Sequence, residues 1–353
     1  MLDCSTTPKL TEINGVSNLL FMKNFILLFC LFSTSLWAVP ERGYTQLWAD
    51  KIFPNFQAMQ FGEFTNKEGL VIRFHFSVKP DAKRSLVILP GRAEPAVKYS
   101  EVIYDLETAD TNVFIMDHQG QGESQRSLPD THKGYVKSFQ NYVADVDQFM
   151  TTVVIPESAG KDLYLLAHSM GGGVSVHYLA QHPGVFKKAF LCAPMLKLNT
   201  KPYAEIVAKI FAFFLQKTGK ATEYAPGKGP YVLEEDTFAK NVVTHSEARF
   251  DMMKALFRDY PQLVVGGPTV QWVSTALKAT GKIQNLGPKI KIPLFLIQSG
   301  NDEYVKNERQ NSFCDKAPDC KRVLYPQAYH EMLMEKDEIR DDVMKNIHEF
   351  FGF

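Results

Sequence analysis

The sequence has no excess of either charge, no long apolar run and no internal repeat. Its 39 Lys and Arg residues balance 39 Asp and Glu residues, so no net field would attract nucleic acid or gather acidic ligands. The apolar run at residues 25–32 is far too short to span a membrane. With 353 residues, 45% of them hydrophobic, the chain can bury a substantial core, and its composition is that of a soluble globular protein.

Cysteine is also scarce, with five residues in the chain. Cys314 and Cys320 flank Pro318, and no His or Cys pair lies nearby to complete a zinc site. We therefore expect a disulfide between these two cysteines and no metal. Cys192 lies in the apolar run at 189–192, where we expect a buried and unreactive thiol.

The N-terminus has the order of a signal peptide. A short, weakly basic segment precedes the apolar run at 25–32, and a polar stretch that ends in the small residue Ala38 follows it. We expect residues 1–38 to be a leader cleaved near Ala38, with Cys4 and Cys30 in the removed part, and export to the periplasm or the cell exterior. Two alternatives stay open: an uncleaved N-terminal segment that keeps the protein at a membrane, and a buried N-terminal helix.

After the leader, short apolar strands alternate with helices. Strands are predicted at residues 61–65, 70–76, 85–89, 112–116, 163–166, 188–192, 293–298 and 322–325, and helices at 97–108, 139–154, 172–181 and 337–350. This alternation predicts an α/β fold with a mainly parallel central sheet and helices on both faces. The first two strands form a hairpin, which adds antiparallel strands at one edge.

The alternation stops between Ala193 and Lys291. Helices are predicted there at residues 203–217, 235–241, 246–259 and 268–280. Because strands resume afterwards, we interpret this stretch as a helical cap, at about residues 195–290, inserted into one domain that spans 39–353.

The stretch from Leu163 to His182 has the strand–turn–helix pattern of a nucleophile elbow. An apolar strand is followed by a turn centred on Ser169 and then by a helix of small residues. Such a turn exposes the serine hydroxyl beside the positive end of a helix dipole. Small residues at 171–173 let the helix approach the strand, although Ala167 stands where the pattern has its first glycine. A purely structural turn is the alternative.

A serine hydroxyl needs a base, and the base needs an orienting acid. Asp302 and His330 each follow a predicted strand, at the edge of the sheet where open α/β folds place their sites. The chain order Ser, Asp, His is that of the α/β-hydrolase triad, so we predict Ser169 as nucleophile, His330 as base and Asp302 as acid. Glu303 and Asp315 are rival acids, Asp302 could instead cap a helix, and His330 could be an ordinary surface histidine. The other histidines considered are predicted to be structural: His118, His132, His168 and His245.

An acyl-transfer site also needs two N–H donors for the developing oxyanion. We predict the backbone N–H of Met170, directly after the nucleophile, and that of Arg92, in the loop after the strand at 85–89. The alternative is that Pro90-Gly91 is an ordinary turn. For the Arg92 side chain we expect a surface ion pair, with contact to a lipid phosphate as a second hypothesis.

Several stretches carry a family resemblance that covers the cap as well as the core. They are Pro90–Glu94, Val97–Tyr99, Asp117–Ser124, Ala167–Gly172, Thr244–Glu247, Val265–Thr269 and Ala328–Glu331. They resemble the monoacylglycerol lipase and bacterial lysophospholipase (L-two type) branch of the α/β-hydrolases. The resemblance implies an α/β-hydrolase fold and an ester hydrolase with the triad Ser169, Asp302 and His330, without metal or cofactor. Pro90 departs from the monoacylglycerol lipase pattern, which has His there, and Arg92 is an unusually bulky oxyanion residue.

The predicted reaction is hydrolysis of the acyl ester of a single-chain lipid, foremost a lysophospholipid. Alternatives are a monoacylglycerol lipase, a general carboxylesterase, a serine aminopeptidase and a lipid-binding member with a dead site. The cap segment 203–217 is apolar nearly all round, so it could cover an acyl-chain tunnel, rest on a membrane surface or simply pack on the core. Phe211, Phe214 and Trp272 are candidate substrate contacts. The oligomeric state stays open.

Overall fold

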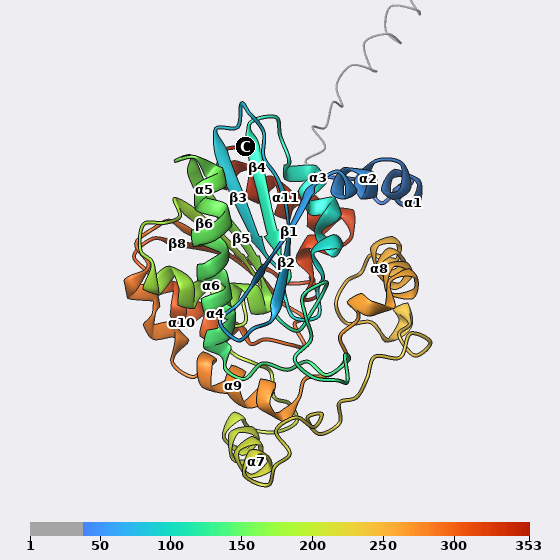
Figure 1. Cartoon of the computed structure of the whole chain (residues 1–353), viewed down its shortest axis with the longest axis vertical. Helices are drawn as coiled ribbons and strands as arrows, with labels where there is room; N and C mark the ends of the chain where they lie inside the picture. The colour runs from blue at the N-terminus through green and yellow to red at the C-terminus, as the bar shows by residue number, and fades with distance from the viewer. Residues whose placement is uncertain (1–37) are drawn as a thin grey trace, which may run out of the picture. The chain divides into compact units, whose positions relative to one another are not determined.

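A computed structural model describes residues 38–353, and the predictions made for residues 1–37, including the leader with Cys4 and Cys30, lie outside the described part. Its centre is an eight-stranded sheet with the order β1-β2-β4-β3-β5-β6-β7-β8 (Figure 1). The strands are β1 (Gln60–Thr65), β2 (Val71–Ser77), β3 (Arg84–Leu89), β4 (Thr111–Met116), β5 (Asp162–His168), β6 (Lys188–Cys192), β7 (Leu294–Ser299) and β8 (Cys320–Tyr325). β2 is antiparallel to both β1 and β4, and all other pairs are parallel, which confirms the predicted sheet and its edge hairpin.

Helices cover both faces of this sheet. The α-helices are α1 (Tyr44–Leu47), α2 (Phe53–Gln57), α3 (Ser100–Leu106), α4 (Phe139–Phe149), α5 (Ile155–Ser158), α6 (Ser169–Gln181), α7 (Glu205–Lys217), α8 (Glu247–Asp259), α9 (Val270–Thr280), α10 (Asn307–Cys314) and α11 (Asp337–Phe351). One apolar cluster joins α4 and α6 to the sheet, and another joins α3 and α11 to the opposite face. No helix in the described part of the chain has the length and hydropathy of a membrane span.

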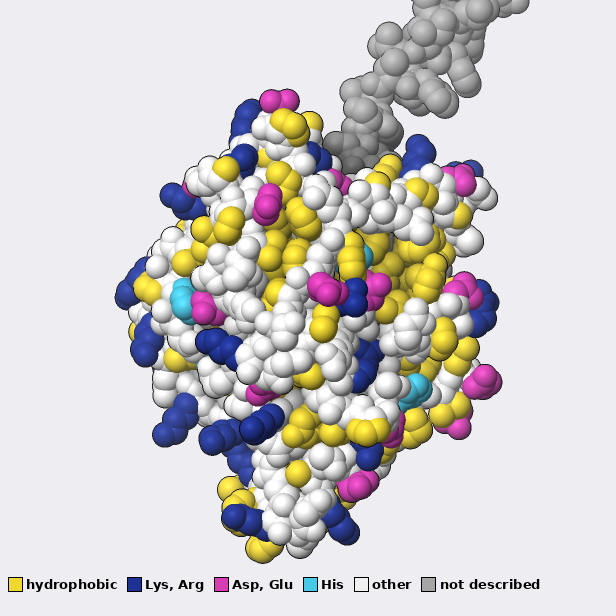
Figure 2. Space-filling model, in the orientation of Figure 1, with side chains coloured by type: hydrophobic (Ala, Val, Ile, Leu, Met, Phe, Trp, Pro, Cys, Tyr) yellow, Lys and Arg dark blue, Asp and Glu magenta, His cyan; other side chains and the backbone are white. Residues whose placement is uncertain are grey.

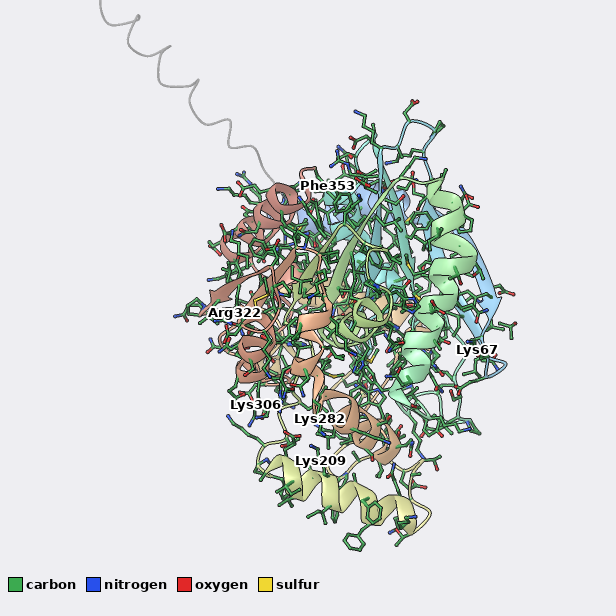
Figure 3. The ribbon with its side chains drawn as sticks, turned by 90° about the vertical axis from the view of Figure 1, so that its left-hand side faces the viewer. Lys67, Lys209, Lys282, Lys306, Arg322 and Phe353 are labelled. Carbon is green, nitrogen blue, oxygen red and sulfur yellow. A yellow bond between two sulfur atoms is a disulfide. The ribbon has the colours of Figure 1, made fainter. Side chains whose placement is uncertain are left out.

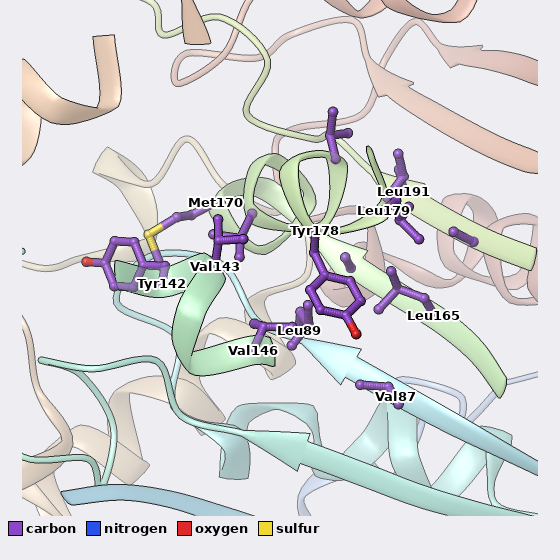
Figure 4. Packing of buried hydrophobic residues seen from close by; sticks show 14 of the residues in the cluster. Val87, Leu89, Tyr142, Val143, Val146, Leu165, Met170, Tyr178, Leu179 and Leu191 are labelled. Atoms are coloured by element: carbon purple, nitrogen blue, oxygen red, sulfur yellow. The ribbon is translucent and has the colours of Figure 1, made fainter. Parts of the chain in front are cut away.

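The two faces follow from the period-two geometry of the strands. On β3, Val87 and Leu89 belong to the cluster with α4 and α6, whereas Leu86 and Ile88 belong to the cluster with α3 and α11. All four side chains are buried because a parallel sheet is covered on both faces. Figure 4 shows Val87 and Leu89 of β3 beneath the side chains of α4 and α6.

The cap contains three of the four predicted helices. Ser246 and Thr269 accept hydrogen bonds from main-chain N–H groups in the first turns of α8 and α9, and both helices begin within two residues of their predicted starts. The helix predicted at 235–241 is wrong, since only a 3₁₀ turn, Phe238–Lys240, forms there. Asp236 explains the break, because Tyr231 Oη donates to its carboxylate at 2.6 Å and a lysine binds its carbonyl oxygen.

Helix α7 does not pack on the core as one of our alternatives proposed. Ala212 is its one buried residue, Leu215 is half-buried, and the other large apolar side chains are exposed to solvent. The exposed apolar residues of α7 are Ile206, Val207, Ile210, Phe211, Phe213 and Phe214. Figure 3 shows α7, which carries Lys209, with aromatic side chains on the side turned away from the rest of the chain.

The described residues contain one disulfide, between Cys314 and Cys320, with the Cα atoms 5.4 Å apart. It joins the end of α10 to the start of β8. Cys192 is a buried free thiol on β6, and burial raises its pKa well above the ordinary value. Such a thiol has little thiolate at neutral pH and is unreactive.

Candidate active site

The turn between β5 and α6 holds Ser169 in a strained conformation. Ser169 has φ 49°, in the left-handed region that non-glycine residues rarely adopt, and it is the first residue of α6. The approach of α6 to its neighbours depends on glycine, because a Cβ on Gly171 would lie 2.1 Å from the carbonyl oxygen of Leu89. A Cβ on Gly172 would lie 2.6 Å from Pro194. The close packing predicted for residues 171–173 is therefore confirmed.

The structure brings Ser169, His330 and Asp302 together in one chain of hydrogen bonds. His330 Nε2 lies 2.8 Å from Ser169 Oγ, and His330 Nδ1 lies 2.7 Å from Asp302 Oδ2. An ionised carboxylate only accepts, so Nδ1–H donates to Asp302 and Nε2 is left to accept the serine proton. This arrangement can convert the hydroxyl of Ser169 into a nucleophile.

Asp302 is held in its charged form. Burial alone would raise its pKa, but His330 and the backbone N–H groups of Tyr304 and Val305 outweigh burial and hold the pKa below the ordinary value. The two N–H groups donate to Oδ1 at 2.8 and 2.9 Å, which leaves Oδ2 for the histidine. The rival acid Asp315 instead forms an ion pair with a surface arginine.

The two backbone amides predicted for the oxyanion hole belong to a helix turn and to a hydrogen-bonded loop. Met170 is in the first turn of α6, where N–H groups have no intrahelical acceptor. Arg92 follows β3, and its N–H has no acceptor among the described residues. The residue before it is fixed at both main-chain groups: Gly91 N–H donates to Glu94 at 2.6 Å, and Gln121 Nε2 donates to the Gly91 carbonyl at 2.7 Å.

A buried charged cluster that sequence reasoning missed lies behind the triad. Glu94 Oε2 accepts from Tyr99 Oη at 2.7 Å as well as from Gly91, and Glu94 Oε1 pairs with Lys98 at 2.9 Å. Lys98 also pairs with Glu331 at 2.6 Å, next to the catalytic-loop histidine. Glu94 and Lys98 are four residues apart within two of the family-like stretches, and this spacing was the available signal.

His168 connects this cluster to His330. Its Nδ1 lies 2.9 Å from Glu94 Oε2, and its Nε2 lies 3.2 Å from the His330 carbonyl oxygen. Both acceptors lack protons to give, so both ring nitrogens of His168 donate and the ring is an imidazolium. Burial opposes this charge, yet Glu94 outweighs burial and raises the pKa of His168. The structural role predicted for His168 is thus a specific one, because it ties the base-bearing loop to the oxyanion-hole loop.

The candidate substrate contacts fall into two groups. Phe211 and Phe214 are exposed on α7, and no described contact brings them to the triad. Trp272 is buried, donates through Nε1 to Tyr142 Oη at 3.2 Å, and lies beneath the guanidinium of Arg92. The surface ion pair expected for Arg92 is wrong: its side chain turns inward onto the cap, where it also binds the Gly266 carbonyl oxygen.

The remaining predicted structural histidines have ordinary partners. Burial lowers the pKa of His118 to about 4, and its ring contacts the Pro90 carbonyl. His132 accepts from a backbone N–H, and His245 pairs with Glu335 at 2.8 Å. Within residues 38–353, no three His, Cys, Asp or Glu side chains come together as a metal site would require.

Comparison with known proteins finds relatives that match most of the chain. A family model described as serine aminopeptidase S33 matches residues 80–337. Lysophospholipase L2 of Escherichia coli strain K12 is 32% identical over 323 residues, which cover 90% of this chain and 94% of that protein. Monoglyceride lipase of Rattus norvegicus is 24% identical over 273 residues, which cover 75% of this chain and 81% of that protein. A solved soluble variant of monoglyceride lipase from Saccharomyces cerevisiae has a TM-score of 0.65 at 17% identity, over 83% of this chain and 94% of that chain, a likeness that shows the fold alone.

Proposed function

The chain belongs to the serine aminopeptidase S33 family of α/β-hydrolases, and from this premise we propose that it hydrolyses the acyl ester of lysophospholipids. The observation that carries the proposal is the hydrogen-bonded chain Ser169–His330–Asp302 at the end of the sheet. The substrate class is supported by the 32% identity to lysophospholipase L2 of Escherichia coli over 90% of the chain.

The reaction would proceed through an acyl-enzyme. His330 takes the proton of Ser169 as Oγ attacks the ester carbonyl carbon, and the N–H groups of Arg92 and Met170 stabilise the oxyanion. The imidazolium then gives its proton to the departing glycerol oxygen, and the carbon–oxygen bond of the ester breaks. Water, deprotonated by His330, releases the fatty acid and restores the serine. Asp302 orients the ring and stabilises its charge in both halves.

Active-site labelling tests the nucleophile. A fluorophosphonate probe should label the native protein and fail to label Ser169→Ala. Ser175→Ala is the matched control, since Ser175 lies on the same helix and only donates to the Gly171 carbonyl, at 2.7 Å. Labelling that survives Ser169→Ala would overturn the assignment.

Two alternative substrate classes are separated by turnover. The family description favours peptides as one rival, and the 24% identity to rat monoglyceride lipase favours monoacylglycerols as the other. Lysophospholipid, monoacylglycerol and aminoacyl amide substrates should be compared by kcat/KM. We expect the lysophospholipid to be preferred, and a preference for either other class would replace our proposal.

We also propose that α7 contacts a lipid surface. Its exposed apolar side chains form a continuous face, and Lys209 and Lys217 lie on the same helix. Figure 2 shows hydrophobic side chains beside Lys or Arg side chains at the lower end of the view, over α7. Apolar side chains flanked by lysines are typical of helices that lie in the plane of a membrane surface.

For location we propose export after cleavage near Ala38, or membrane association if the N-terminal segment is kept. The Cys314–Cys320 disulfide supports export, because such bonds persist in oxidising compartments. N-terminal sequencing of the protein from its own cells would test cleavage, and an N-terminus before the apolar run at 25–32 would contradict it.

A further inference from the structure

The side chain of Arg92 occupies an unusual position beside the proposed site. It leaves the oxyanion-hole loop and lies against the cap, with Cζ 5.3 Å from the ring centroid of Trp272. Its Nη2 donates to the carbonyl oxygen of Gly266. The phenol of Tyr304 lies close enough to act electrostatically on Arg92, and the ring of Tyr304 is 5.1 Å from that of His330. Tyr304 is therefore a common neighbour of the guanidinium and of the catalytic base.

The positive charge of Arg92 has no counter-charge within the described residues. The groups that act on it electrostatically are the uncharged phenols of Tyr142 and Tyr304, and no carboxylate is among them. The nearby Lys98 is already paired with Glu94 and Glu331. Burial lowers the pKa of Arg92 to about 10, so the side chain stays protonated at neutral pH. A partly buried charge without a partner is costly unless a ligand supplies one.

One donor of the guanidinium is also unused. The Nε atom of Arg92 is enclosed and has no hydrogen-bond partner among the described residues. Its Nη2 is taken by Gly266, whereas Nε and Nη1 have no described acceptor. The planar fork that binds two oxygens of a phosphate or carboxylate pairs Nη2 with either Nε or Nη1, so the second N–H of Nη2 can complete a fork with either unused nitrogen.

The length of the side chain matches a glycerophospholipid. The backbone nitrogen of Arg92 would bind the ester oxyanion, and its guanidinium carbon is separated from that nitrogen by as many covalent bonds as separate the ester carbonyl carbon from the phosphorus of a 1-acyl lysophospholipid. The reach of the side chain from the oxyanion hole is thus compatible with the distance from ester to phosphate in this substrate.

We propose that the Arg92 side chain binds the phosphate of the lysophospholipid head group and selects this substrate over neutral monoacylglycerols. This inference rests on the proposed function, since it assigns one residue of that site to one part of that substrate. The rival role is a structural latch between the loop and the cap, through Gly266 and Trp272.

The test compares two substrates that differ only in the phosphate-bearing head group, 1-oleoyl lysophosphatidylethanolamine and 1-oleoyl glycerol. For Arg92→Gln, the ratio of their kcat/KM values should fall about 10- to 100-fold, as expected for the loss of a hydrogen-bonded charge. Arg92→Lys keeps the charge but loses the fork, so its ratio should fall less. If Arg92→Gln does not fold, as judged by circular dichroism, the ratio for Arg92→Lys carries the test.

Arg126→Gln is the matched control. Arg126 is also a latch to the cap, because it donates to the carbonyl oxygens of Ser124 at 2.8 Å and Gln262 at 2.9 Å. Its substitution should leave the substrate ratio unchanged. An unchanged ratio in the Arg92 variants, or an equal fall in the control, would overturn the phosphate role while leaving the proposed function intact. Failure of the native protein to hydrolyse either lipid would instead overturn the proposed function.

Inorganic phosphate distinguishes a head-group site from a site for the free ion. For a head-group site, millimolar phosphate should leave hydrolysis of 1-oleoyl glycerol by the native protein unaffected. Free phosphate is not attached to a bound acyl chain, so it binds the guanidinium only weakly. Strong inhibition that disappears in Arg92→Gln would show a free-phosphate site and contradict the proposal.

Discussion

The elbow around Ser169 and the cap helix α7 are built on opposite principles. Around the elbow, buried charged side chains are paired: Glu94 binds three donors through one oxygen, and His168 donates from both ring nitrogens. On α7 the apolar side chains face solvent, with Phe214 61% exposed and Ala212 only 5% exposed. The first region is determined by packing and hydrogen bonds, and the second contributes little burial to the fold.

This difference separates the chemistry from access to the lipid. A tightly packed, rigid elbow can hold a nucleophile, a base and two amides at fixed distances, which acyl transfer requires. The apolar face of α7 is exposed, so substitutions on it should hardly change the free energy of unfolding. The same face is free to contact substrate or a membrane. Substitutions in the two regions should therefore separate catalysis, stability and lipid binding.

The largest effect is expected at the nucleophile. Ser169→Ala should reduce kcat for lysophospholipid by about 10⁴-fold or more, because the attacking atom is removed while the fold is kept. Turnover of the variant measures the loss of catalysis, and its thermal unfolding shows whether the fold is kept. Retention of more than a few per cent of the activity would show that Ser169 is not the nucleophile.

The next effect is on stability at the elbow. Gly171→Ala places a Cβ 2.1 Å from the Leu89 carbonyl oxygen, which is backbone and cannot turn away. We expect the free energy of unfolding to fall by about 3–4 kcal/mol in urea titrations. Gly229→Ala is the control, because nothing lies within 4 Å of the added Cβ, and its effect should stay within about 0.5 kcal/mol. Equal effects of the two substitutions would refute the packing argument.

A similar but pH-dependent loss is expected at His168. His168→Asn removes the cation between Glu94 and the His330 carbonyl, and should cost about 3 kcal/mol near pH 6. The folded pKa of His168 is raised, so its stabilisation is fully present below the unfolded pKa of about 6.5 and is lost as pH rises through the folded pKa.

Urea unfolding of both proteins above pH 5 measures this dependence, since Glu94 has a pKa lowered well below the ordinary value and stays ionised there. The other charges that face the pair, Lys98 and Glu331, are retained in the variant. The difference in unfolding free energy should shrink toward high pH. A difference that is independent of pH would show that the ring of His168 is not a cation.

The smallest effect on stability is expected on α7. Phe211→Ser with Phe214→Ser should change the free energy of unfolding by less than about 0.5 kcal/mol, because both rings are already exposed. The double variant should nevertheless sediment less with lipid vesicles. Leu324→Ser is the control, since Leu324 is a similarly exposed apolar residue on β8. Equal vesicle binding by all three proteins would remove the lipid-surface role of α7.

Much of the fold could be predicted because its signals are local. The apolar strands at 85–89 and 188–192 and the helices at 246–259 and 268–280 depend on short-range patterns, and the structure has them within two residues of the predicted bounds. The false helix at 235–241 arose for the opposite reason. Asp236 is bound by Tyr231 and Lys254, and these contacts outside the segment compete with helix formation.

The sequence by itself determined the chemistry of this protein, because a serine at an elbow, with Asp302 and His330 at later strand ends, can meet only at one edge of a parallel sheet. Only the tertiary structure decided what surrounds that chemistry. It turned Arg92 away from the surface and onto Trp272, and it placed His168 between Glu94 and the His330 carbonyl. The physical reason is that the charge state and direction of a side chain depend on neighbours that packing brings from distant parts of the chain.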